Sequence, residues 1–174
     1  MLINLFFLIK GLFMNTFTIN LLILLTLTSV AAQCMQQGPA LPRLHQAAKD
    51  GNIEIVREEL ATHAADEREP VDGKTALHFA CQYGHTEIAQ MLLAAGANIE
   101  AKTNKGATAL HYACANSRTK SAQMLLAAGA DKDAKDNNGN TPLHAACVNG
   151  HTTTAQILLA AGADKDAINN VDGN

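Results

Sequence analysis

The stretch TALHFA at residues 75–80 returns as TALHYA at residues 108–113 and as TPLHAA at residues 141–146. A shorter relative, LHQA, stands at residues 44–47. The histidines of the four stretches follow one another at intervals of 33 residues. A fixed period of this length predicts a stack of equal supersecondary units, because each unit can bury its apolar face only against its neighbours. Such stacks typically present binding surfaces, so the period favours recognition over catalysis.

Residues 75–107 show how one unit is expected to be built. Thr75 is the predicted N-cap of a short helix that runs to about Tyr83, and Gly84 ends it by tolerating a positive φ. A second helix is predicted over residues 86–95, because its apolar side chains recur at the i, i+3, i+4, i+7 spacing of one helical face. The polar, turn-rich residues 97–106 predict an extended, hairpin-like loop.

With three full blocks in register, residues 41–174 resemble the ankyrin-repeat family. The resemblance implies an all-α solenoid in which paired helices form the body and hairpin loops project from it. Four repeats are expected, at about residues 41–73, 74–106, 107–139 and 140–174. The usual activity of the family is protein–protein recognition by the concave face, which loop tips and first helices form. Pro stands at the second position of only one full block, as Pro142, which leaves the resemblance intact.

Residues 1–32 differ from the rest of the chain. They are dominated by Leu, Ile and Phe, carry a single charged side chain, and end in the small residues SVAA at positions 29–32. This pattern predicts a secretory signal peptide that is cut before Gln33, with residues 33–40 as a linker; a cut after Ala31 fits almost as well. The alternative is an uncleaved membrane anchor, because the segment is long enough to span a bilayer. The protein is therefore expected to be secreted or exported, or else anchored to a membrane by this segment alone.

The charge of the chain narrows the class of partner. The formal net charge is −3, and leaving out Lys10, the only charged side chain of residues 1–32, makes it −4. No basic stripe is present, which argues against nucleic acid. We expect the partner to be another protein, and we expect no small-molecule substrate and no cofactor.

The periodic histidines and cysteines are expected to be structural. His45, His78, His111 and His144 stand one per repeat, whereas metal ligands must converge within about 2.1 Å of one ion. The family resemblance implies that this histidine ties adjacent loops together. Cys81, Cys114 and Cys147 also recur every 33 residues, so we expect unpaired, small, buried apolar side chains at one copied position. We predict no metal site and no enzyme, because the repeat already accounts for these residues.

The aromatic residues indicate where a partner would bind. After residue 32 the only aromatic residues are Phe79, Tyr83 and Tyr112, all on predicted first helices, and aromatic residues are favoured anchors of interfaces. The alternative for Phe79 and Tyr112 is packing between adjacent helices. The positions that vary in binding ankyrin repeats complete the predicted contact surface: Asp72, Lys74, Gln82, Lys102, Lys105, Ala115, Asn116, Lys135, Asn138, Asn140, Val148 and Asn149.

The sequence thus predicts a non-enzymatic, exported protein-interaction module that binds its partner through the concave face of an ankyrin stack. The alternative function is a membrane-tethered ankyrin scaffold that recruits a cytosolic partner. Whether residues 1–32 persist in the mature chain separates the two.

Overall fold

The computed structural model describes residues 42–61 and 64–170, which belong to a compact unit spanning Leu41–Asn174. Regular structure within these residues is entirely α-helical, and eight helices follow one another in four pairs. Their bounds are Arg43–Asp50 (α2), Ile53–Leu60 (α3), Ala76–Tyr83 (α4), Thr86–Ala94 (α5), Ala109–Ala115 (α6), Thr119–Ala127 (α7), Pro142–Val148 (α8) and Thr152–Ala160 (α9). The predicted all-α stack of four helix pairs is confirmed.

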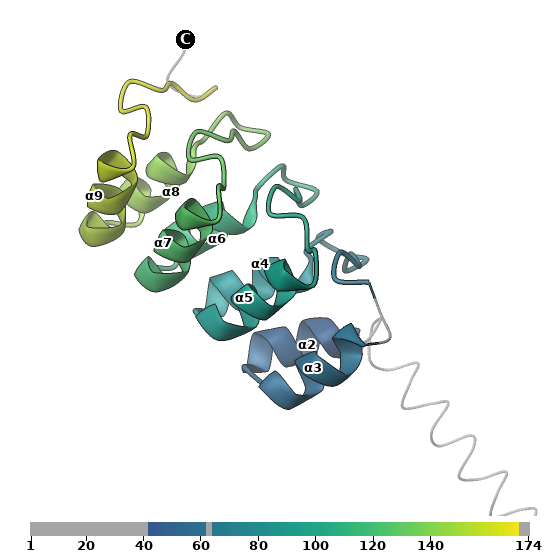
Figure 1. Ribbon diagram of the computed structural model, residues 1–174. Coiled ribbons are helices and arrows are strands. Elements are labelled where there is room, and N and C mark those ends of the chain that lie inside the picture. Colours follow the sequence, from purple (N-terminus) through teal and green to yellow (C-terminus); the bar gives the residue numbers. More distant parts are fainter. Residues whose placement is uncertain (1–41, 62–63, 171–174) are drawn as a thin grey trace, which may run out of the picture. The chain divides into compact units, whose positions relative to one another are not determined.

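The helices form two layers. The first helices, α2, α4, α6 and α8, pack on one another in chain order, and the second helices, α3, α5, α7 and α9, form a looser second layer. The loops between successive pairs leave the helices on the same side of the stack (Figure 1). A face made of first helices and loops is therefore available for recognition.

Leucines at two periodic positions fill the space between the layers. Fully burying one such side chain contributes about 1.5–3 kcal/mol. In the first pair, Glu59 stands where the later pairs have a leucine, and its buried carboxylate lies 3.0 Å from Nη1 of Arg43. A buried charge requires such a partner. The leucines are Leu44, Leu77, Leu110 and Leu143 on the first helices and Leu92, Leu125 and Leu158 on the second.

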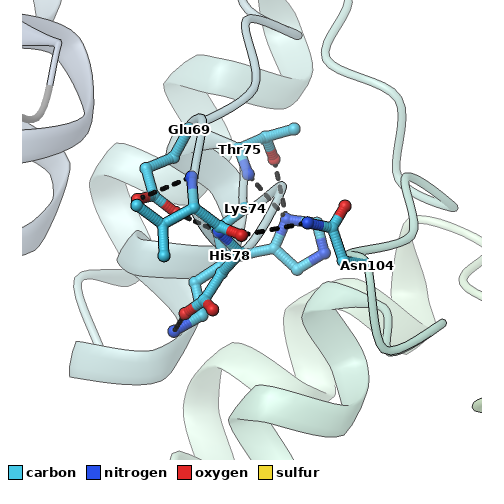
Figure 2. Close-up of polar contacts among 7 residues, drawn as sticks. Glu69, Lys74, Thr75, His78 and Asn104 are labelled. Atoms are coloured by element: carbon cyan, nitrogen blue, oxygen red, sulfur yellow. Dashed lines mark hydrogen bonds and ion pairs between the residues drawn. The ribbon is translucent and has the colours of Figure 1, made fainter. Parts of the chain in front are cut away.

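A buried histidine joins each of the middle repeats to the next. Nδ1 of His78 accepts a hydrogen bond from the backbone N–H of Thr75 at 3.0 Å and lies 2.9 Å from the Thr75 hydroxyl (Figure 2). Because Nδ1 is an acceptor, Nε2 carries the proton, and it donates to the Ala107 carbonyl at 3.2 Å. His111 repeats this arrangement with Thr108 and with the Asn140 carbonyl. The expected structural role of these histidines is thus visible in their hydrogen bonds.

The first and last copies of this histidine differ from the middle two. Nε2 of His45 donates to the Glu67 carbonyl at 2.9 Å, but its buried Nδ1 has no partner. The reason is that Pro42 occupies the register position of Thr75 and offers neither a hydroxyl nor an N–H. Nδ1 of His144 keeps its bond to Thr141, while residue 173, which stands one period after Asn140, lies outside the described residues.

A second row of side chains ties the start of each second helix to the preceding repeat. Nε2 of His85 donates to the Lys49 carbonyl at 3.0 Å, and Nε2 of His151 donates to the Ala115 carbonyl at 3.0 Å. Between them the chain has Arg118, whose Nε donates to the Gln82 carbonyl at 3.1 Å. Arg118 therefore makes the same joint as the two histidines, although its side chain is of another type.

The loops are connected by asparagines at one copied position. Nδ2 of Asn104 donates to the Val71 carbonyl at 3.0 Å (Figure 2). Asn137 and Asn170 repeat this bond one and two loops further on. In the first loop the carboxylate of Glu69 accepts from the N–H groups of Val71 and Asp72, at 3.2 and 2.9 Å. Each loop is thus fixed to its predecessor, and the first loop is closed by its own side chain.

One of the three periodic cysteines differs from the predicted burial. Cys81 and Cys114 are buried free thiols, and burial raises the pKa of each to about 12. Cys147 is a free thiol too, but it is exposed, so the prediction of burial was wrong for this copy. Cys81 and Cys114 are covered by the first helix of the following pair, and no described helix follows α8 in that layer.

Replacing Ser117 with glycine should stabilise the fold. Ser117 has a φ of 55° at the position where Gly84 and Gly150 end the equivalent first helices of their repeats. The left-handed conformation costs a residue with Cβ about 1–2 kcal/mol, and part of the gain is offset by the greater freedom of glycine in the unfolded chain. We expect Ser117→Gly to raise the free energy of unfolding by about 0.5–1 kcal/mol. Urea denaturation measures this, and Ser117→Ala, which keeps the strain, is the control that should show no gain.

Acid should weaken the stack through His78. Burial, with smaller effects from Lys74 and Arg68, lowers the pKa of His78 from 6.5 to about 4 against the opposing effect of its backbone hydrogen bonds. Between these values the unfolded chain binds a proton that the folded chain does not, so stability falls as the pH falls from 6.5 towards 4. This group alone should remove about 2 kcal/mol between pH 7 and pH 5.

Denaturation at the two pH values measures that loss, and the variant His78→Gln should show a smaller pH dependence than the wild type. An NMR titration of the His78 ring that gave a midpoint near 6.5 would contradict the mechanism.

Candidate functional site

A depression of about 240 Å³ lies between the first helices α6 and α8 and the loop that joins α7 to α8. Apolar and aromatic side chains form much of its wall, and a carboxylate and two histidines add polar groups. Its lining residues are Ala107, His111, Tyr112, Ala115, Asp136, Asn140, His144, Ala145, Val148 and Asn149. The site therefore belongs to the face that first helices and loops form.

The loop side of the depression is held by Asp136. Its Oδ1 accepts hydrogen bonds from the backbone N–H groups of Asn138 and Asn140, both at 2.8 Å. The Asn140 carbonyl in turn accepts from Nε2 of His111 at 3.0 Å. Carboxylate, loop and helix α6 are thus positioned by one chain of hydrogen bonds.

The helix side of the depression is apolar and exposed at one end. Tyr112 and Ala115 come from α6, and Ala145 and Val148 come from α8. Val148 is 86% exposed, and Asn149 next to it donates from Nδ2 to the Ala145 carbonyl at 2.7 Å. An exposed aliphatic side chain beside a half-buried tyrosine suits contact with an apolar group.

A second cluster adjoins the depression through Tyr112. The ammonium group of Lys74 lies 5.1 Å from the centroid of the Tyr112 ring and 5.4 Å from that of Phe79, within the range of cation–π attraction. The same ammonium lies 3.2 Å from a carboxylate oxygen of Asp72, and the Lys74 side chain is only 15% exposed. Lys74 is therefore part of the packing between α4 and α6.

The histidines of the depression are suited to holding the fold. Burial is the main cause that lowers the pKa of His111, and the hydrogen bond to Asn140 and the nearby Asp136 act in the opposite direction. Both ring nitrogens of His111 are hydrogen-bonded, and Nδ1 of His144 is bonded to Thr141. No group of three or more His, Cys, Asp or Glu side chains in the described part of the chain could hold a metal ion. The arrangement offers an apolar wall with a carboxylate and two histidines at its polar side.

The structure brings part of the predicted contact surface together. Tyr112, Ala115, Asn140, Val148 and Asn149 line the depression. Asp72, Lys74 and Phe79 form the adjoining cluster, where Phe79 is 7% exposed and packs edge-on against His45 at 5.9 Å.

The other predicted contact residues lie elsewhere. Tyr83 is 38% exposed at the end of α4 and lines a separate hollow with Ser117 and Arg118, while the Gln82 carbonyl accepts from Arg118. Asn116 donates to the Tyr112 carbonyl at 2.8 Å. On the loops, Lys102 and Lys135 donate to the backbone of the following loop, and the carbonyls of Lys105 and Asn138 accept from it. These loop residues thus help to fix the stack.

Sequence reasoning missed half of the depression. Ala107, His111, Asp136, His144 and Ala145 line it and were not predicted as contact residues. A signal for two of them was present, because a comparison of register positions shows alanine at 107 where the preceding repeat has Lys74, and alanine at 145 where it has Tyr112. Small residues at copied positions mark where a periodic surface is hollowed.

The N-terminal prediction lies outside the described residues, since residues 1–41 include the whole segment assigned to a signal peptide or anchor and the linker. Among the helices of residues 42–61 and 64–170, none is both long and apolar enough to cross a membrane.

Comparison with family models identifies the repeats. The model described as ankyrin repeats, in three copies, matches residues 18–103, 44–136 and 100–169. A comparison with curated proteins finds no match. Ankyrin repeats generally mediate protein–protein interaction and are typically non-enzymatic. With the matched residues covering most of the chain and four helix pairs joined by the copied histidines, the protein belongs to the ankyrin-repeat family.

Proposed function

We propose that this protein is an exported, non-enzymatic recognition module that binds a partner protein with the face formed by its first helices and loops. The observation that carries the proposal is the depression between α6 and α8, which both the half-buried Tyr112 and the 86% exposed Val148 line. Aromatic and aliphatic groups that converge in a hollow are the usual anchor points of an interface.

The chemistry of this face supports binding over turnover. His111 is bonded to Thr108 and to the Asn140 carbonyl, His144 is bonded to Thr141, and burial holds the pKa of His111 below its ordinary value. The hollow is smaller than the roughly 300–1,000 Å³ of sites that enclose a whole small molecule. It suits a side chain presented by a larger partner.

Export rests on the composition of residues 1–32, and a membrane-tethered scaffold is the alternative that the same residues support. In the first case the partner lies outside the producing cell, and in the second it is cytosolic.

Capture of the partner tests the recognition face. We expect the full chain with a C-terminal tag to retain a specific partner. The variant Val148→Glu should retain about tenfold less of that partner, because a charge would be buried in the apolar wall. The matched control is Gln156→Glu, which adds the same charge at an exposed position of α9. Equal retention by both variants, or capture of no partner, would contradict the proposal.

The N-terminus of the mature protein tests export. Mass spectrometry of the protein purified from its producing cell should find a chain that begins at Gln33, with residues 1–32 removed. A chain that keeps these residues and sediments with membranes would contradict export and favour the tethered scaffold. The result does not depend on whether a partner has been found.

A further inference from the structure

The preceding repeat shows which kind of side chain fits the depression. Between α4 and α6, the space beside the first helices is filled by the side chain of Lys74, which lies against the rings of Phe79 and Tyr112. The residues one period further on, at positions 107, 112 and 145, are Ala107, Tyr112 and Ala145. All three line the depression.

The depression is thus the space that Lys74 fills one repeat earlier. One period after Lys74 the chain has Ala107, and one period after Tyr112 it has Ala145. Tyr112 itself stands one period after Phe79, so the depression keeps one of the two rings. Because the helices and loops keep their spacing through the copied hydrogen bonds of His78 and His111, the loss of side-chain volume leaves a hollow of about 240 Å³.

The polar lining of the hollow carries negative charge. Asp136 lines it, and no Lys or Arg side chain does. In the filled space the carboxylate of Asp72 lies 3.2 Å from the Lys74 ammonium, although the register equivalent of Asp136 in that repeat is Thr103. The salt bridges found among the described residues do not include Asp136. Lys102 and Lys135 donate to the carbonyls of Lys135 and Ile168, and neither side chain lines the depression. Oδ2 of Asp136 also accepts a hydrogen bond from Nδ2 of Asn140 at 3.3 Å. A carboxylate retains acceptor capacity beyond this bond and the two backbone bonds.

We propose that the depression receives a lysine or arginine side chain of the partner protein, in the way that the preceding repeat receives its own Lys74. The aliphatic stem lies along Ala107, Ala145 and Val148, and the cation lies beside the Tyr112 ring and the Asp136 carboxylate. This inference rests on the proposed function and adds the chemistry of the anchor. The net charge of −3 favours the approach of such a basic segment.

Peptides with one variable side chain test the inference directly. The probes are acetylated pentapeptide amides with four glycines and a central lysine, arginine, norleucine or glutamate, titrated into the full chain and followed by NMR signals of Tyr112, Ala145 and Val148. The lysine and arginine peptides should bind at least about fivefold more tightly than the norleucine peptide, and the glutamate peptide should bind most weakly.

Two variants and a control locate the effect. Asp136→Asn keeps an oxygen for the loop hydrogen bonds and should remove most of the preference for lysine over norleucine. Ala107→Lys should abolish peptide binding, because its own side chain would fill the hollow as Lys74 does one repeat earlier. Ala160→Lys adds the same charge at an exposed position of α9 and should bind like the wild type. Circular dichroism checks that each variant is folded, and Asp136→Asn suffices if Ala107→Lys does not fold.

Equal binding of lysine and norleucine peptides, a preference for glutamate, or the absence of any shift at these residues would overturn the inference. Its failure is distinct from failure of the proposed function. If capture retains a partner that Ala107→Lys binds as well as the wild type does, the face still recognises a protein but not through a basic anchor. If capture retains none, the proposed function fails whatever the peptides do.

Discussion

A neutral imidazole bonded at both ring nitrogens is the element on which the rest of this stack depends. One nitrogen accepts from the threonine that begins its own helix, and the other donates to a carbonyl of the next loop, as in His78 and His111. Leaving a buried polar group unpaired costs about 1–3 kcal/mol, so each loop is held at one height above its helix. The loop height then decides where Asp136 and Asn140 stand relative to α6 and α8. The recognition face thus inherits its geometry from a buried hydrogen bond.

The framework and the recognition face use different positions of the same repeat. Threonine, histidine and the paired leucines recur almost unchanged, whereas positions 74, 107 and 140 are Lys, Ala and Asn. The histidine joints use the backbone carbonyls of residues 107 and 140, so a substitution at these positions changes the surface and leaves the acceptor of each joint in place. The hollow between α6 and α8 is therefore a difference between copies, and the stack tolerates it because neighbouring joints carry the spacing.

The sequence predicted the framework far better than the face. The interval between histidines indicated four helix pairs, and Thr75, Gly84 and residues 86–95 placed the helix bounds to within a residue. It misjudged Cys147, since burial depends on what packs over a copied position and not on the copy itself. It also missed Asp136 and His144, because a search for variable and aromatic positions does not reveal which of them border the same hollow. The hydrogen bond made by Arg118 was not predicted either, because arginine and histidine both offer an N–H donor but do not form a recognisable sequence repeat.

Glu69 has a consequence for the solubility of the stack. Successive loops add to one another through backbone and asparagine bonds, much as strands add to a sheet, and an open row of N–H groups invites another chain to add itself. At the first loop, where no described loop precedes it, the carboxylate of Glu69 occupies the N–H groups of Val71 and Asp72. It also places a negative charge where an incoming backbone would have to lie. One acidic side chain thereby occupies two donors to which the backbone of another chain could otherwise add.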